Sequence, residues 1–274
     1  MADLLTILGT PFVLRAIIAV LLISVNAAIA GTLTVFRRAE FLVAGVSHAA
    51  LAGAALAIVL TIHADIVIDP LLGALGFALL LAFIAGFASR KGDSTDLNTS
   101  IGIGFAMSMS LAVVFISLIR EYASRVWGIL FGDLLLITER DLVLLLVATS
   151  LVVVCTLLFH REFVFISFDM EGAIAYGVRA RALNYLMLGL IAVSIVVLLK
   201  GVGAILVFAM LVSPAATANR LARSVPRVFG LAFLLALFSG YCGLVSSFLV
   251  AVSPGAIASL IATALYFIVL TVRR

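Results

Sequence analysis

The chain has 274 residues, of which 65% are hydrophobic and 11% are charged, and its mean hydropathy is +1.38. A soluble domain carries about 25% charged residues, so this composition excludes an ordinary soluble enzyme and indicates a polytopic membrane protein. The net charge of +4 does not point to a nucleic-acid partner, because the basic residues are confined to short segments between apolar runs.

Apolar runs recur along the whole chain and predict an all-α membrane protein with about nine transmembrane helices. Each run approaches the ~20 residues that a helix needs to cross a bilayer, and the alternating pattern of a membrane β-barrel is absent. The runs lie near residues 14–36, 40–62, 66–88, 99–119, 141–160, 184–200, 202–219, 228–250 and 255–272. With no long linker between them, residues 1–274 are expected to form a single transmembrane domain.

Two segments interrupt this pattern. The sixth and seventh runs are separated only by "LLKGVG", which predicts a tight reversal or a broken helix, with Lys200 reaching the outer interface. Residues 122–138 are too short and too interrupted for a span, and we expect a surface or re-entrant segment there.

Basic residues are distributed unequally between the two sides of the predicted bundle. One side collects twelve: Arg37, Arg38, Arg90, Lys91, Arg161, Arg179, Arg181, Arg220, Arg223, Arg227, Arg273 and Arg274. The other side collects five: Arg15, Arg120, Arg125, Arg140 and Lys200. The positive-inside rule therefore places the N-terminus outside and the C-terminus in the cytoplasm, as an odd number of spans requires.

Within the second predicted span, residues 41–60 carry Ser47 and His48 as their only strongly polar side chains. Ionisable groups within the membrane-spanning part of a helix usually face the interior of the bundle or a water-filled path. Small residues recur on another face of this span, at Gly45, Ala49, Gly53 and Ala57, and predict close packing against a neighbouring helix. His48 is thus open to two interpretations: a packing histidine bonded to a backbone carbonyl, or a group that lines a pathway and binds a metal transiently.

The loop after the second span contains His63, Asp65 and Asp69. A histidine and two carboxylates are suitable ligands for Zn²⁺ or Mn²⁺, so His63 and Asp65 are candidate transient metal ligands at the mouth of a pathway. Solvated loop charge is the alternative. Asp133 and Glu139 lie on the same side and allow the same two interpretations.

The loop at 160–183 is predicted to contain a short helix of about two turns on the cytoplasmic face. Asp169 can cap its N-terminus, Glu171 lies in the first turn, and Gly177 can end it. The residues alone allow an interfacial helix anchored by arginines or a docking element for a soluble partner.

The seventh span contains Ser213, Pro214 and Thr217. We expect a kink whose freed carbonyls accept hydrogen bonds from the hydroxyls, with a gating role as the functional alternative. The chain has no GxxxxGK[ST] motif, so ATP hydrolysis, where the system uses it, belongs to another subunit.

Five stretches in order give the chain a resemblance to the membrane permeases of metal-ion ABC importers, which move zinc, manganese or iron. The stretches are "SHAALAG" (47–53), "LFGDLLLITERDL" (130–142), "FDMEGAIAYGVRARALN" (168–184), "KGVGAILVFAMLVSPAATA" (200–218) and "SPGA" (253–256). The sequence departs from the family where it has Ala44, a position that commonly carries an acid, and Ala52, where proline is common.

The resemblance implies a non-enzymatic transport subunit without a tightly bound cofactor, in the plasma membrane of a prokaryote and surrounded by lipid. Its implied partners are a cytoplasmic ABC ATPase, an extracytoplasmic metal-binding protein and a second permease copy. Asp169, Glu171, Ala175 and Gly177 would couple to the ATPase, and a divalent transition metal would be the transported substrate.

Alternatives to this function remain at this point. One is a permease for a metal chelate or another small nutrient, although such permeases tend to be longer. Another is an ATP-independent secondary carrier, for which inverted repeats and deep coupling carboxylates would be expected and are not evident. A membrane scaffold would leave the capped loop helix without a purpose.

Overall fold

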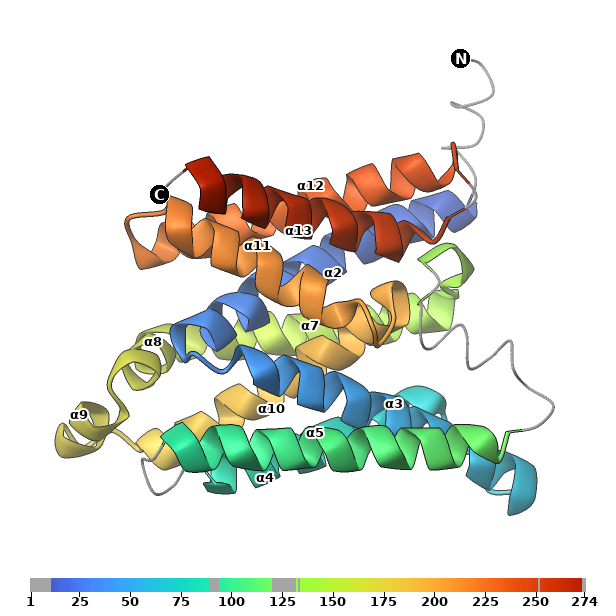
Figure 1. The fold of residues 1–274 in the computed structure, drawn as a ribbon, viewed down its shortest axis with the longest axis horizontal. Coiled ribbons are helices and arrows are strands. Elements are labelled where there is room, and N and C mark those ends of the chain that lie inside the picture. The colour runs from blue at the N-terminus through green and yellow to red at the C-terminus, as the bar shows by residue number, and fades with distance from the viewer. Residues whose placement is uncertain (1–10, 89–93, 120–131, 133, 251, 273–274) are drawn as a thin grey trace.

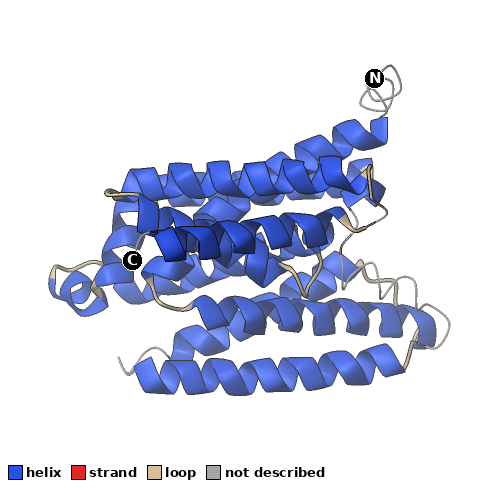
Figure 2. Cartoon of the chain, turned by 45° about the horizontal axis from the view of Figure 1, so that its top comes forward, coloured by secondary structure: helices blue, strands red, loops and turns tan. Residues whose placement is uncertain are grey.

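A computed structural model describes residues 11–88, 94–119, 132, 134–250 and 252–272, and every regular element in these ranges is helical (Figure 2). The all-α prediction is therefore confirmed. The elements are α2 (Pro11–Phe36), α3 (Glu40–His63), α4 (Pro70–Ala88), α5 (Ser94–Ser117), the 3₁₀ turn η2 (Leu134–Leu136), α7 (Glu139–Leu158), α8 (His160–Phe168), α9 (Met170–Ala175), α10 (Ala180–Val202), α11 (Val207–Leu221), α12 (Val225–Ser247) and α13 (Pro254–Val272).

Eight of these helices are long and apolar enough to cross a membrane. They match eight of the nine predicted spans, and the seventh run forms the shorter helix α11, with 15 residues. At 1.5 Å per residue α11 is about 22 Å long, less than the ~30 Å of a bilayer's hydrocarbon core. Most of the segment predicted as re-entrant, 122–138, falls outside the described residues.

The reversal predicted at "LLKGVG" is made at Gly203. Its φ of +85° lies in the region that only glycine adopts readily, and its N–H caps α10 by donating to the Leu199 carbonyl. The backbone then turns, with the Leu206 N–H donating to the Gly203 carbonyl, and α11 begins at Val207. A tight reversal, and not a kinked continuation, therefore connects α10 to α11 (Figure 1).

Two groups of helices flank a central layer. On one side α3 packs against α4 and α5, and on the other α11, α12 and α13 pack against one another (Figure 1). Between them α2 contacts α7, α10, α11 and α12, and α10 also contacts α4. The main hydrophobic core runs through these central helices, where Ile23, Leu33, Met187, Ile191 and Ile195 are almost fully buried.

The molecule has two distinct ends along its longest axis. The short helices α8 and α9 lie at the same end as the last turn of α13, whereas α2 begins at the opposite end (Figure 1). We call these the α9 end and the outer end. The candidate residues of the loop at 63–69 belong to the outer end, and those of residues 169–177 to the α9 end.

Candidate functional site

His48 is half-buried on α3, and its two ring nitrogens are in different situations. Nδ1 lies 2.8 Å from the carbonyl oxygen of Ala44, one turn earlier on the same helix. Because a carbonyl can only accept, Nδ1 carries a hydrogen, and in the neutral form of the ring the lone pair lies on Nε2. The ring of Phe105 from α5 packs edge-on, with 4.9 Å between ring centroids. Nε2 is therefore the nitrogen that can bind a metal ion.

Ser47 shares the hydrogen-bond acceptor of His48 and adds no second metal ligand beside it. Its buried hydroxyl donates to the same Ala44 carbonyl at 3.0 Å. At the position where Ala44 stands, an acidic side chain would have added a carboxylate one turn from the imidazole. In this chain that turn offers only a methyl group and a carbonyl that already accepts two hydrogen bonds.

The small-residue stripe of α3 faces α4, as its spacing predicts. A Cβ added to Gly53 would collide with the backbone carbonyl of Gly73, so the two helices are in backbone contact there. Gly45 faces Leu81 of α4 and Ile101 of α5. His48 lies on another face of α3, toward Phe105, and both His48 and Gly45 of the stripe have neighbours on α5.

The three candidates of the seventh span lie on α11, a helix that also packs against α3. Pro214 and Thr217 are buried and Ser213 is half-buried. The Thr217 hydroxyl donates to the Ser213 carbonyl at 2.7 Å. Pro214 removes the donor to the carbonyl of Met210, so the hydroxyl does not bond the freed carbonyl that the sequence led us to expect.

The loop at 63–69 does not gather its three candidate ligands. His63 Nδ1 bonds the Val59 carbonyl at 3.2 Å, and Asp65 is exposed with a φ of +52°. Asp69 accepts from the Leu71 N–H at 2.9 Å at the start of α4. Within the described part of the chain no group of three His, Cys, Asp or Glu side chains is placed to hold a metal ion. Asp133 lies outside the described residues.

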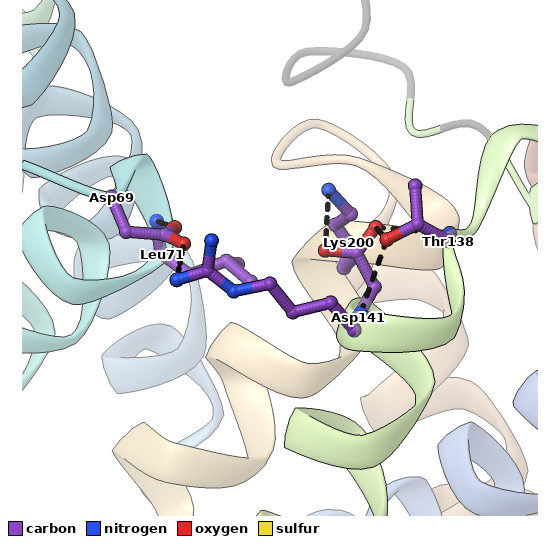
Figure 3. Close-up of polar contacts among 6 residues, drawn as sticks. Asp69, Leu71, Thr138, Asp141 and Lys200 are labelled. Carbon is purple, nitrogen blue, oxygen red and sulfur yellow. Dashed lines mark hydrogen bonds and ion pairs between the residues drawn. The ribbon is translucent and has the colours of Figure 1, made fainter.

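Two ion pairs at the outer end were not predicted (Figure 3). Arg140 and Asp141 are adjacent at the start of α7 and pair with different helices. Arg140 Nη2 lies 3.3 Å from Asp69 Oδ2 of the α4 start, and Lys200 Nζ of the α10 end lies 3.1 Å from Asp141 Oδ1. Lys200, expected to reach the interface alone, is thus paired and only one-third exposed.

The sequence carried a partial signal for this cluster. Thr138 and Asp141 form a capping box, in which Thr138 Oγ1 accepts from the Asp141 N–H and Asp141 Oδ2 accepts from the Thr138 N–H. The spacing of a hydroxyl and an acid three residues apart is the signature of such a box and could have placed the start of α7. The partners on α4 and α10 could not be read from it.

At the α9 end the short helix forms as predicted. The Asp169 carboxylate accepts from the Gly172 N–H at 2.7 Å, which caps α9, and Gly177 has a φ of +79° just beyond its last turn. Glu171, Ala175 and Gly177 are exposed, whereas Ala173 on the opposite face is fully buried. The helix is attached along one face and presents the other to solvent.

These elements suit passage and docking more than covalent chemistry. His48 offers one imidazole nitrogen inside the bundle, the outer end carries paired charges, and the α9 end presents a capped helix.

Comparison with known proteins finds relatives along almost the whole chain. The family model of the ABC 3 transport family matches residues 9–273. The manganese transport system membrane protein MntC of Listeria innocua is 30% identical over 257 residues, covering 94% of this chain and 89% of the relative. The manganese import system permease protein ScaB of Streptococcus gordonii is 32% identical and covers 84% and 82%. The solved structure of PsaBC from Streptococcus pneumoniae in complex with Fab contains a chain with a TM-score of 0.85 and 26% identity, covering 98% of this chain and 95% of that one.

Proposed function

Because the chain belongs to the ABC 3 transport family and is the membrane permease of a metal ABC import system, we propose that it carries Mn²⁺ or a related divalent transition metal as the free ion. The ATPase of such a system is a separate chain. The observation that carries the function is the family match, which extends over residues 9–273.

Among the divalent transition metals, Mn²⁺ is the substrate that we propose first. The matched relatives from Listeria and Streptococcus are named for manganese, and both align over more than four fifths of this chain. His48 supports a divalent transition metal, since an imidazole nitrogen suits Zn²⁺ and Fe²⁺ and binds Mn²⁺, which prefers oxygen ligands, more weakly. A single nitrogen binds these ions weakly, which suits an ion that passes and does not stay. Any selectivity for manganese would then come from another component of the system.

The proposed partners follow from the two ends of the molecule. A cytoplasmic ATPase would dock on α9, where Glu171, Ala175 and Gly177 are exposed. An extracytoplasmic metal-binding protein would deliver the ion at the outer end, and a second copy of the permease would complete the pathway. Closure of the ATPase dimer would move α9 and so switch the pathway between its two openings.

Uptake into vesicles that contain the permease and its partner subunits tests the function. We expect ATP-dependent accumulation of radiolabelled Mn²⁺, with Zn²⁺ and Fe²⁺ compared in parallel. The matched control is the same complex with an ATPase that binds but does not hydrolyse ATP, which should not accumulate metal. Equal uptake with and without hydrolysis would exclude an ATP-driven importer.

A further inference from the structure

Arg37 ties the end of α2 to the joint between α8 and α9. Its Nη1 donates to the Ile166 carbonyl at 3.0 Å, and its Nη2 lies 3.7 Å from the sulfur of Met170. Ile166 belongs to the last turn of α8, whose carbonyls have no partner within the helix, and Met170 is the first residue of α9. One guanidinium therefore contacts both elements on either side of Asp169.

The burial of this contact makes it different from an ordinary surface arginine. The Ile166 carbonyl belongs to a residue that is almost fully buried, and burial lowers the pKa of the Arg37 guanidinium from its ordinary value. Arginine nevertheless stays protonated in proteins, so the group remains a charged donor at a helix C-terminus, where a positive charge is favoured.

Aromatic packing strengthens the same junction. Phe36, the last residue of α2, packs against Phe168 of α8 with ring centroids 5.1 Å apart and against Phe229 of α12 at 6.1 Å. Phe168 directly precedes Asp169, the cap of α9. The end of α2 is thus held to the α8–α9 joint by rings as well as by hydrogen bonds.

The other part of the connection lies six residues before Arg37, at Gly31 of α2. A Cβ added to Gly31 would collide with the backbone carbonyl of Leu211, so α2 and α11 touch through their backbones. Besides the Leu211 backbone, the nearest atom to the position that a Gly31 Cβ would take is the methyl group of Ala215, which has no rotamer with which to absorb a displacement of α2. Helix α11 carries Ser213, Pro214 and Thr217, which lie within two turns of this crossing.

We propose that Arg37 is the positioning residue that transmits movement of α9 to α2 and, through the Gly31–Leu211 crossing, to α11. The inference rests on the proposed function, because it assigns Arg37 a part in the coupling between ATPase and permease. Two acceptors on two elements require the forked guanidinium, and a lysine can satisfy only one of them with the same geometry. Replacement of Arg37 should therefore leave α9 folded and docked but loosen its connection to the spans.

The test uses the complete importer, with ATPase, permease and binding protein, in proteoliposomes. The measured quantity is metal taken up per ATP hydrolysed in the wild type and in Arg37→Gln, Arg37→Lys and Arg38→Gln. Arg38 is the exposed neighbour of Arg37 and serves as the matched control. We expect Arg37→Gln to lower the ratio about tenfold, which is within the range of site-to-site coupling energies. Arg37→Lys should fall between Arg37→Gln and the wild type, and Arg38→Gln should equal the wild type.

Two results would overturn the proposal. An unchanged ratio in Arg37→Gln would show that α9 is coupled without Arg37. A loss of assembled complex and of uptake in proportion, at constant uptake per ATP, would show that Arg37 only stabilises the fold.

A second measurement separates this proposal from the proposed function. If the wild-type complex hydrolyses ATP but accumulates no metal, the function is wrong, and Arg37 is judged from a spin label at Asn219, exposed near the end of α11. ATP should change the label-to-label distance between two permease copies in the wild type and leave it unchanged in Arg37→Gln. An equal change in both would reject the role of Arg37.

Discussion

The Nδ1 atom of His48 is bonded to the Ala44 carbonyl at 2.8 Å, and the edge of Phe105 fixes the ring on another side. The sequence placed the imidazole and the small-residue stripe on different faces of the second span. It could not predict which neighbour His48 would meet, because Phe105 is more than fifty residues away and nothing local pairs α3 with α5. It also allowed both a packing and a pathway interpretation, and a ring with one bonded and one available nitrogen satisfies both.

Replacing His48 distinguishes these two interpretations. In His48→Leu we expect uptake of Mn²⁺ to fall at least about tenfold, the lower bound of what even indirect changes at metal sites cost. Assembly with the ATPase should not change, because the residues that hold the His48 ring belong to α3 and α5 and not to α9. The matched control is Ser47→Ala, which removes a donor to the same carbonyl and leaves the imidazole bonded. Normal uptake by His48→Leu would identify His48 as a packing residue.

The ion pairs of the outer end show which contacts between single residues cannot be predicted from the sequence. Asp69, Arg140 and Lys200 were recognised from the sequence as charges on one side of the membrane, whereas Asp141 was not singled out. The paired residues lie at the ends of three helices that are distant in sequence. Arg140 is largely exposed, and an exposed pair contributes little to stability. The consequence of these pairs is geometric: the start of α7 is connected to both α4 and α10.

At the scale of elements, prediction succeeded where local chemistry defines a helix. Helix α9 has six residues, too few to be stable by itself, so its cap and its one buried face carry most of its order. Asp169 and Gly177 were identified from sequence because capping acids and terminal glycines act within one turn. Helix α11 was less predictable, since hydropathy counted residues 203–206 as part of its span, whereas Gly203 begins a turn there.

The cap of α9 offers a test of its docking role. Asp169→Ala removes the acceptor of the Gly172 N–H and should cost about 1 kcal/mol of local helix stability. Because α9 would then fray, we expect less ATPase to co-purify with the permease. Asp169→Asn is the matched control, since asparagine caps helices about as well as aspartate and should retain the ATPase. Equal co-purification of the Ala variant and the wild type would argue against α9 as the docking element, and loss in both variants would point to the charge instead.

At the scale of the whole molecule, hydropathy and charge together predicted the architecture. Apolar length identified eight helices that can span the membrane, and the asymmetry of arginine and lysine gave their expected direction. How the helices are grouped could not be predicted, because lipid-facing and buried positions in a membrane are equally apolar. The backbone contacts of Gly31 with Leu211 and of Gly53 with Gly73 decide that grouping, and each joins residues from separate spans.

The direction of the chain across the membrane is the remaining prediction. The sequence predicts twelve basic residues on the side of the 160–183 loop, which contains α9, and five on the other side, so we expect the α9 end in the cytoplasm. Two exposed positions of similar accessibility report on the two ends: Tyr176 beside α9 is 83% exposed and Val67 in the loop at 63–69 is 87% exposed. Each is changed to cysteine after the half-buried Cys155 and Cys242 are replaced by alanine.

A maleimide that does not cross membranes then reads the orientation in intact cells. Val67→Cys should react at once, because its side would face the outside, and Tyr176→Cys should react only after the cells are opened. Labelling of opened cells is the control, in which both cysteines should react. The reverse pattern in intact cells would invert the topology and place α9 where no cytoplasmic ATPase can reach it. That outcome would remove the proposed docking role of α9 and, with it, the coupling role of Arg37, whereas the expected pattern leaves both to be decided by the uptake ratio.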